Sequence, residues 1–153
     1  MSRLTVLPFE PDHLRTLVQR PRSLESCSTD RWVELTLDLW KDPGGLAWSI
    51  FDAEEIILIG MVFRSPVNPS QEGLAAVHTA EKVIEHPLAC TRIVKAHLEK
   101  AATLLGISRV YASVISEWDM AKRWIRVLGF ETFGKAPNPF DANHEVMLYV
   151  RTF

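Results

Sequence analysis

A long amphipathic helix between two strand-like segments is the feature that most restricts the fold of this chain. The helix is predicted over 87–105, with Pro87 in its first turn and Gly106 directly after its end. Its apolar residues recur at helical spacing: Val94, Leu98, Ala101, Ala102 and Leu105. The flanking segments Leu74–Ile84 and Arg109–Ile115 are predicted strands. Because such a unit forms a right-handed crossover in nearly all cases, we expect two parallel, neighbouring strands joined by this helix.

The rest of the chain is predicted to alternate short strands and helices. The expected strands are Leu4–Pro8, Ala47–Phe51, Ile56–Phe63, Phe130–Phe133 and Glu145–Val150, with Asp52–Glu55 as a hairpin turn. The expected helices are Pro11–Val18, Asp30–Leu39 and a segment that begins with a capping box at Ser116–Asp119 and ends at Gly129. This order indicates an α/β fold with a mixed sheet, about seven strands and four helices, in a single domain over residues 1–153.

Several side chains are predicted to lie in the core. They are Trp32 and Trp40 on the second helix, and Trp124, Leu128 and Phe130 at or near the last helix.

Composition excludes several classes of function. The longest uncharged apolar run, Ile56–Phe63, is far shorter than the roughly 20 residues that span a bilayer, and the first residues, Met1–Thr5, do not have the apolar core and small-residue cleavage site typical of a signal peptide. We therefore expect a soluble, cytoplasmic protein. A net charge of −2 gives no general reason to bind nucleic acid. Cys27 and Cys90 are expected to be free thiols, and the histidine spacing predicts no metal site.

Two segments carry a resemblance to a known family. The helix ending at Gly106, with the strand that follows it, is similar to the long helix and strand of the GNAT N-acetyltransferases. The stretch Trp118–Phe130, with Ala121 and the ending Leu128-Gly129-Phe130, resembles the next helix of that superfamily. The resemblance covers nearly the whole chain and implies a GNAT fold. It also implies acetyl-coenzyme A as the expected cofactor and an amine as the acceptor.

The segment that would bind coenzyme A departs from the GNAT pattern. In the family, a loop of pattern R/Q-x-x-G-x-G/A opens the long helix, and its glycines let backbone amides approach the cofactor pyrophosphate. Here the corresponding residues are His86, Pro87, Leu88, Ala89, Cys90 and Thr91, none of them glycine. Pro87 lacks an amide hydrogen, whereas Arg92 and the helix dipole still favour an anion. We therefore expect acetyl-coenzyme A to bind weakly or not at all.

The next helix departs from the family as well. Ile125 stands where many GNAT enzymes have a tyrosine that protonates the leaving thiolate, and Trp118 stands where they have an asparagine. Isoleucine cannot donate a proton. Trp118 is expected either to fill the cleft or to serve as an exposed contact for a protein partner, because tryptophan is enriched at interface hot spots.

Four residues are candidates for catalysis if the chain is an enzyme. His78, Glu81 and Glu85 lie on or just after the strand that carries the general base in the family, and Tyr111 could act as an acid. The alternative, which we favour, is that the carboxylates are solvated and that His78 and Tyr111 are structural. Cys90, at a helix N-terminus, would have a lowered thiol pKa, although no histidine next to it in the sequence supports a catalytic role.

Three functions follow from this pattern. A GNAT-like domain with an eroded cofactor motif is similar to small GNAT-like proteins encoded by tailed bacteriophages. The first interpretation is a scaffold that binds another protein, such as a host enzyme in the host cytoplasm. The second is an acetyl-CoA-dependent N-acetyltransferase with an atypical cofactor loop, and the third is a structural virion component. The sequence leaves the partner, the acceptor amine and the choice between monomer and dimer open.

Overall fold

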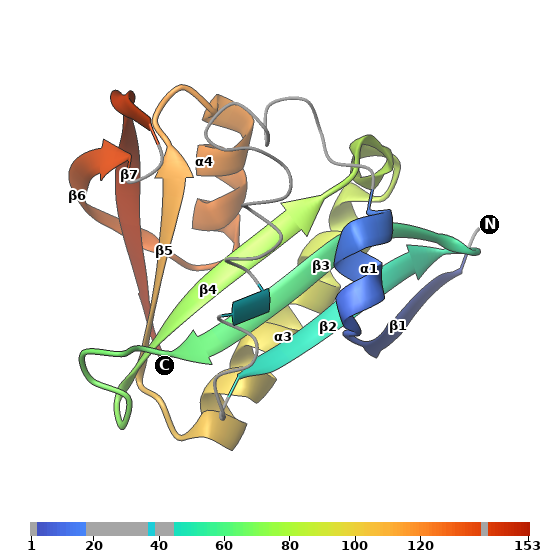
Figure 1. Ribbon diagram of the computed structural model, residues 1–153, viewed down its shortest axis with the longest axis horizontal. Helices are drawn as coiled ribbons and strands as arrows, with labels where there is room; N and C mark the ends of the chain where they lie inside the picture. The colour runs from blue at the N-terminus through green and yellow to red at the C-terminus, as the bar shows by residue number, and fades with distance from the viewer. Residues whose placement is uncertain (1–2, 18–36, 39–44, 139–140) are drawn as a thin grey trace.

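The computed structural model describes residues 3–17, 37–38, 45–138 and 141–153, and its main feature is one seven-stranded mixed sheet (Figure 1). The strands are β1 (Leu4–Pro8), β2 (Leu46–Asp52), β3 (Glu55–Arg64), β4 (Glu72–Thr79), β5 (Arg109–Ile115), β6 (Glu131–Asn138) and β7 (Asp141–Thr152). Their order across the sheet is β1-β2-β3-β4-β5-β7-β6. The predicted α/β class and mixed sheet are thereby confirmed.

The sheet opens in its middle, between β4 and β5. These two strands are parallel, as predicted, but they pair only where Glu72–Leu74 lies beside Arg109–Tyr111. Beyond that point residues 75–79 of β4 stay paired with β3, and residues 112–115 of β5 stay paired with β7. Figure 1 shows the two strands diverging toward their carboxyl ends. We call the opening between 75–79 and 112–115 the β4–β5 wedge.

Helices cover both faces of the sheet. Helix α3 (Pro87–Leu105) lies behind it in Figure 1, and the short helix α1 (Pro11–Thr16) lies in front. The predicted apolar stripe of α3 is buried, and the helix ends at Gly106, whose φ of 65° suits glycine. Because both faces are covered, β3 is buried at eight consecutive positions, Ile56–Phe63. Its almost continuous apolar sequence is explained by this placement.

The segment after β4 differs from the prediction. The strand ends at Thr79 rather than at Ile84, and a 3-10 helix, η2, covers Glu81–Glu85. Thr79 pairs with Leu58, so the strand stops close to the end of its antiparallel partner. The turn that follows is closed by the amide of Val83, which donates to the carbonyl of Ala80. The charged residues of this stretch therefore lie on a surface turn, which spares them the cost of burial in a sheet.

The last hairpin also differs, because its strands are longer than predicted. Pro137 and Asn138, expected in a loop, belong to β6, and Pro137 lies opposite Glu145. A proline fits here because β6 is the edge strand of the sheet, where one side needs no ladder hydrogen bond. This part of β6 was not predicted from the sequence, because proline normally indicates a loop.

Helix α4 (Asp119–Val127) begins later than predicted. Its N-cap is Trp118, with no side-chain capping hydrogen bond, so the expected capping box at Ser116–Asp119 does not form. Leu128 and Phe130 are buried as predicted. Trp124 is only partly buried and packs against the edge of the core that α3 and α4 share. Trp124, which was predicted to be largely buried in the core, is therefore less buried than expected.

Helix α1 ends at Thr16, two residues before its predicted end. Most of the helix predicted over Asp30–Leu39, with Trp32 and Trp40, lies outside the described residues; Leu37 and Asp38 are helical. In the described part of the chain, no helix has both the length and the apolar character needed to cross a bilayer.

Candidate functional site

The first turn of α3 has free backbone amides that could bind an anion, but side chains crowd the surface around them. The amides of Leu88 and Ala89 have no hydrogen-bond partner among the described residues, whereas the amide of Cys90 already donates to the carbonyl of His86. Pro87 occupies the first helical position and contributes no donor. The Leu88 side chain is 71% exposed at this turn. Two free amides therefore remain, next to an apolar side chain.

Thr91 ties the first turn of α3 to α4. Its hydroxyl lies 2.6 Å from the carbonyl oxygen of Pro87, to which it donates, and it accepts a hydrogen bond of 2.9 Å from Nε1 of Trp124. In the GNAT pattern this position is a glycine or alanine, which leaves the space beside the helix open. Here the hydrogen-bonded side chains of Thr91 and Trp124 occupy the space between the first turn of α3 and α4.

Cys90 points into the core rather than toward a substrate. The residue is buried, and burial raises the pKa of its thiol to about 11. The lowered pKa expected at a helix N-terminus is therefore wrong. Desolvation by the surrounding apolar residues outweighs the helix dipole, because the side chain lies among core residues rather than in line with the free amides.

His78, on β4, is a neutral imidazole. Burial lowers the pKa of His78 to about 3, and its Nε2 atom is shielded from solvent. A general base works best when its pKa lies near the working pH, so such a depressed pKa makes this imidazole a weak base at neutral pH.

The other three catalytic candidates do not converge on His78. Glu81 and Glu85 are exposed on η2. Tyr111 lies where β4 and β5 are still paired, and its hydroxyl donates to Glu72 at 3.2 Å. The structure therefore gives these candidates separate surroundings, and no acid–base pair forms among them.

Trp118 and Ile125 lie on α4, as the sequence indicated. Ile125 is buried in the core shared with α3, where the family has its proton donor. Trp118 is half-buried at the start of the helix, and the next apolar side chain, Met120, is largely exposed. The exposure of Trp118 is therefore intermediate between the two expectations, a buried side chain that fills the cleft and an exposed contact for a protein partner.

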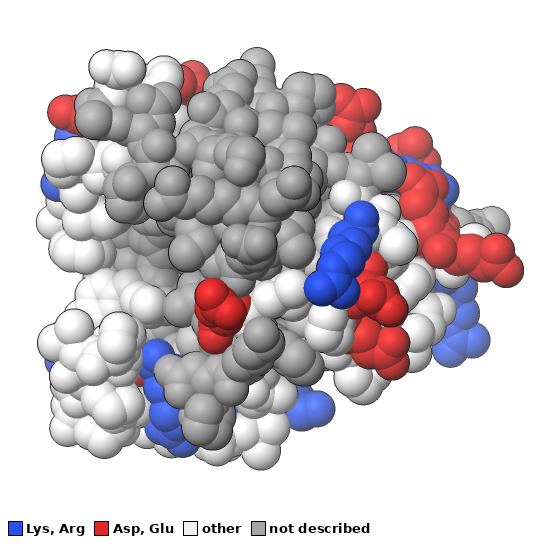
Figure 2. All heavy atoms as spheres, viewed as in Figure 1, with Lys and Arg blue, Asp and Glu red and all other residues white. Residues whose placement is uncertain are grey.

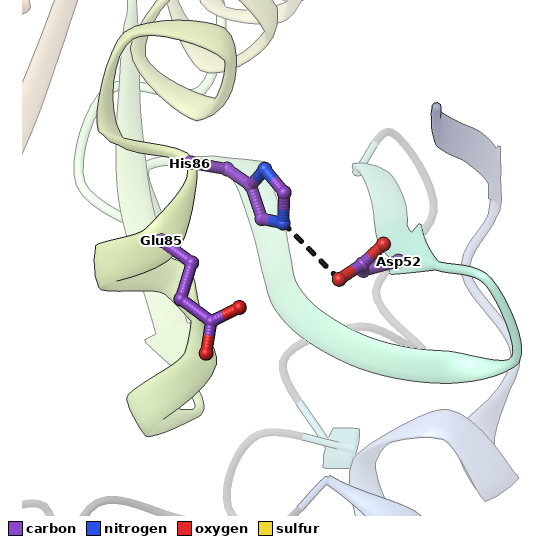
Figure 3. A group of neighbouring side chains, drawn as sticks. All are labelled: Asp52, Glu85 and His86. Atoms are coloured by element: carbon purple, nitrogen blue, oxygen red, sulfur yellow. Dashed lines mark hydrogen bonds and ion pairs between the residues drawn. The ribbon is translucent and has the colours of Figure 1, made fainter. Parts of the chain in front are cut away.

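A charged cluster that the sequence did not reveal lies just before α3. The carboxylate of Asp52, at the end of β2, is almost fully buried and accepts from Lys82 Nζ at 3.1 Å. His86 Nε2, at the N-cap of α3, lies 3.1 Å from the same oxygen, Oδ2. Lys82 also contacts Glu55 at 3.0 Å. Figure 3 shows the side chain of Glu85 turned toward the same gap as Asp52 and His86.

The contacts in this cluster shift the pKa values of Asp52 and Lys82. Hydrogen bonds from Lys82, and then from His86, hold the pKa of the Asp52 carboxyl below its usual range. The hydrogen bonds of Lys82 to Glu55 and to Asp52 raise the pKa of its ammonium group. Asp52 appeared in the sequence only as a turn residue, because nothing in the spacing links it to a histidine 34 positions away.

Comparison with known proteins shows the fold. No protein-family model matches the chain, and no curated protein sequence matches it either. Among solved structures, an acetyltransferase from Streptococcus agalactiae is similar with a TM-score of 0.76 and 12% identity, covering 98% of both chains. A GNAT-family acetyltransferase from Streptococcus pneumoniae has a TM-score of 0.72 and 16% identity, covering 98% of this chain and 99% of its own.

A third similar structure is a chimera of the spermidine N-acetyltransferase SpeG from Vibrio cholerae and hSSAT. Its TM-score is 0.73 at 18% identity, covering 99% of this chain and 96% of its own. The chain therefore has the fold of the GNAT acetyltransferases over almost its full length. At these identities the likeness concerns the scaffold, so the function depends on the residues of the site.

Coenzyme A does not fit the residues at the expected site. Side chains stand at both glycine positions of the loop, Ala89 and Thr91, and Thr91 is bonded to α4. The pyrophosphate would meet two free amides and Arg92, and Leu88 lies over the same turn.

Proposed function

We propose that this chain is a GNAT-fold binding protein that acts by docking onto another protein and has lost productive coenzyme A binding. The observation that carries the proposal is the Thr91–Trp124 hydrogen bond, which closes the approach between α3 and α4 at the position of the cofactor loop. The separate placement of the catalytic candidates supports the same conclusion, since a scaffold that only binds needs no acid–base pair.

The partner is expected to be a protein contacted near the start of α4. Trp118 and the exposed Met120 place apolar surface there, beside the wedge. A host enzyme is the partner class implied by the resemblance to phage-encoded GNAT-like proteins. A virion component would use the same surface for assembly, and recovery of the chain in purified particles would favour that role.

The β4–β5 wedge is the observation that favours the second candidate, an N-acetyltransferase. Parallel strands that separate after three paired residues leave an opening of the kind in which the family admits cofactor and substrate. If the chain is such an enzyme, Glu81 or Glu85 is the base to test first.

A calorimetric titration with acetyl-coenzyme A distinguishes the two candidates. Loss of two or three hydrogen bonds to a charged group, at about 1.5–3 kcal/mol each, costs about 3–9 kcal/mol in total, and a micromolar ligand weakens into the millimolar range or beyond once this loss exceeds about 4 kcal/mol. We therefore expect little heat at millimolar ligand. The variant Pro87→Arg/Ala89→Gly/Thr91→Gly, which reopens the turn, should recover measurable binding. A low-micromolar dissociation constant for the unmodified protein would place the acetyltransferase first.

The docking surface is tested with Trp118→Ala. Immobilised protein is incubated with host lysate, and bound proteins are quantified by mass spectrometry for the unmodified chain and the variant. Phe133→Ala is the matched control, because Phe133 is an exposed aromatic on β6, away from the start of α4. A partner retained by Phe133→Ala and lost by Trp118→Ala supports the proposal. Equal retention by both variants contradicts the role of Trp118.

A further inference from the structure

The charged cluster before α3 brings together three groups of the kind that bind metal ions. One oxygen each from Asp52 and Glu85 and a ring nitrogen of His86 all lie within 4.8 Å of one another. Two places in the fold supply these residues: Asp52 ends β2, and the consecutive residues Glu85 and His86 lie where η2 meets α3. Figure 3 shows their polar ends directed into one gap.

The chemistry of this set matches a zinc-type ion. Imidazole and carboxylate are both zinc ligands, and bonds of about 2.0–2.1 Å in a tetrahedral site place neighbouring ligand atoms roughly 3.4 Å apart. His86 Nε2 and Asp52 Oδ2 are already 3.1 Å apart. Glu85 is exposed, so rotation of its side chain can close the remaining distance. Water would complete the four ligands.

The local charge also favours a cation. The carboxylates of Asp52 and Glu55 both contact the ammonium group of Lys82, and a third carboxylate, that of Glu85, lies close to Asp52. Asp52 is buried and already holds a cation on Oδ2. Acidic side chains gather at the right of Figure 2, over the end of the molecule where Figure 1 places the β2–β3 hairpin and η2. A divalent ion would therefore reduce an unbalanced negative charge.

We propose that Asp52, Glu85 and His86 bind a divalent metal ion of the zinc type, which joins the β2–β3 hairpin to the first turn of α3. In the metal-free protein, Lys82 and His86 share the carboxylate of Asp52. On binding, the metal takes Asp52 and the neutral Nε2 of His86, while Lys82 keeps its ion pair with Glu55. The site includes His86, from the segment that corresponds to the coenzyme A loop, and Glu85, one of the catalytic candidates, but the proposed metal binding requires neither coenzyme A nor a partner at Trp118.

The test measures binding of zinc to the full chain after removal of metal with a chelator. Zn²⁺ is titrated in competition with a chromophoric chelator, and the stoichiometry and affinity are compared between variants. Glu85→Gln removes a ligand and should not disturb folding, because Glu85 has no hydrogen-bond partner among the described residues. Glu81→Gln removes an equally exposed carboxylate from the other end of η2 and is the matched control.

We expect saturable binding of one Zn²⁺ per chain, with affinity at least about tenfold lower in Glu85→Gln and unchanged in Glu81→Gln. Lys82→Gln should bind Zn²⁺ more tightly, since it removes the competing ammonium from Asp52. Absence of saturable binding, or equal affinity in Glu85→Gln and Glu81→Gln, overturns the site. If Lys82→Gln does not fold, judged by circular dichroism, the comparison of the two glutamate variants decides the question alone.

Cobalt provides a second measurement of the same site. Co²⁺ should replace Zn²⁺ and give the visible bands of a nitrogen- and oxygen-bound ion, without the charge-transfer band of a thiolate ligand. A thiolate band would assign the metal to a cysteine and overturn the proposal.

Discussion

His78 shows how one partly buried side chain, with its Nε2 atom shielded from solvent, sets a pH dependence for the whole protein. Burial lowers the pKa of His78 to about 3, against about 6.5 in the unfolded chain. Between these values the unfolded state binds the proton and the folded state does not. Stability therefore falls as the pH decreases from 6.5 toward 3, by up to about 1.4 kcal/mol per pH unit.

The replacement His78→Leu should flatten this dependence. We expect the unfolding free energy of the variant, measured by urea denaturation, to change much less between pH 6.5 and 4 than that of the unmodified protein. The lower limit of pH 4 stays above the pKa of the Asp52 carboxyl, which the hydrogen bonds from Lys82 and His86 hold below its usual range. An unchanged slope in His78→Leu would show that another group takes up the proton.

Gly60 is a second residue whose identity is set by its neighbour. A Cβ atom at Gly60 would lie 2.4 Å from Cζ2 of Trp48, a buried residue that stacks on His97. Because the Trp48 ring is buried in the core, it cannot shift freely, so Gly60→Ala should destabilise the protein by about 3 kcal/mol, at the upper end for overpacking. Gly134→Ala is the control, because its added carbon meets only Leu148, at 3.9 Å. We expect the control to change the free energy of unfolding by less than about 0.5 kcal/mol.

At the scale of the elements, the sequence predicted those whose pattern is local. Helix α3 was found with its exact bounds, because Pro87, the apolar stripe and Gly106 all mark it within the segment itself. The end of β4 was missed because it depends on where the antiparallel partner β3 begins. The cluster at Asp52 was missed because it also depends on contacts between residues far apart in the sequence: its partners lie on η2 and at the start of α3.

The contact between α3 and α4 can be tested by changing Trp124. Trp124→Phe keeps most of the packing and removes the hydrogen bond to Thr91, so we expect a loss of about 1 kcal/mol. Trp124→Ala also removes the ring, and should cost about 3 kcal/mol, the low end for a large core side chain, because Trp124 is only partly buried. Thermal and urea denaturation measure both changes. An unaltered stability in Trp124→Ala would contradict the packing of α4 described above.

At the scale of the whole molecule, the sheet consists of two antiparallel parts joined by a short parallel contact. The strands β1–β4 form one part and β5–β7 the other, and only Glu72–Leu74 and Arg109–Tyr111 pair across the junction. An ion pair of 2.9 Å between Arg109 and Glu72 reinforces it. The sequence predicted that β4 and β5 are parallel neighbours. It could not predict that they separate, because that depends on the packing of α3 and α4 behind them.

Hydrogen exchange should locate this opening and report on what occupies it. In an antiparallel ladder every second residue directs its amide away from its partner strand. Among residues 75–79 and 112–115, such amides face the β4–β5 wedge, where the other strand is out of hydrogen-bonding reach. We expect these amides to exchange much faster than the amides of β3, which has strands on both sides.

Millimolar acetyl-coenzyme A should leave this exchange unchanged, because the turn at 86–91 is closed by Thr91 and Trp124. In the reopened variant Pro87→Arg/Ala89→Gly/Thr91→Gly, the same ligand should slow exchange in the wedge and in the first turn of α3. A protein partner should instead protect the amides around Trp118. Protection of the wedge by acetyl-coenzyme A in the unmodified chain would contradict the closed site.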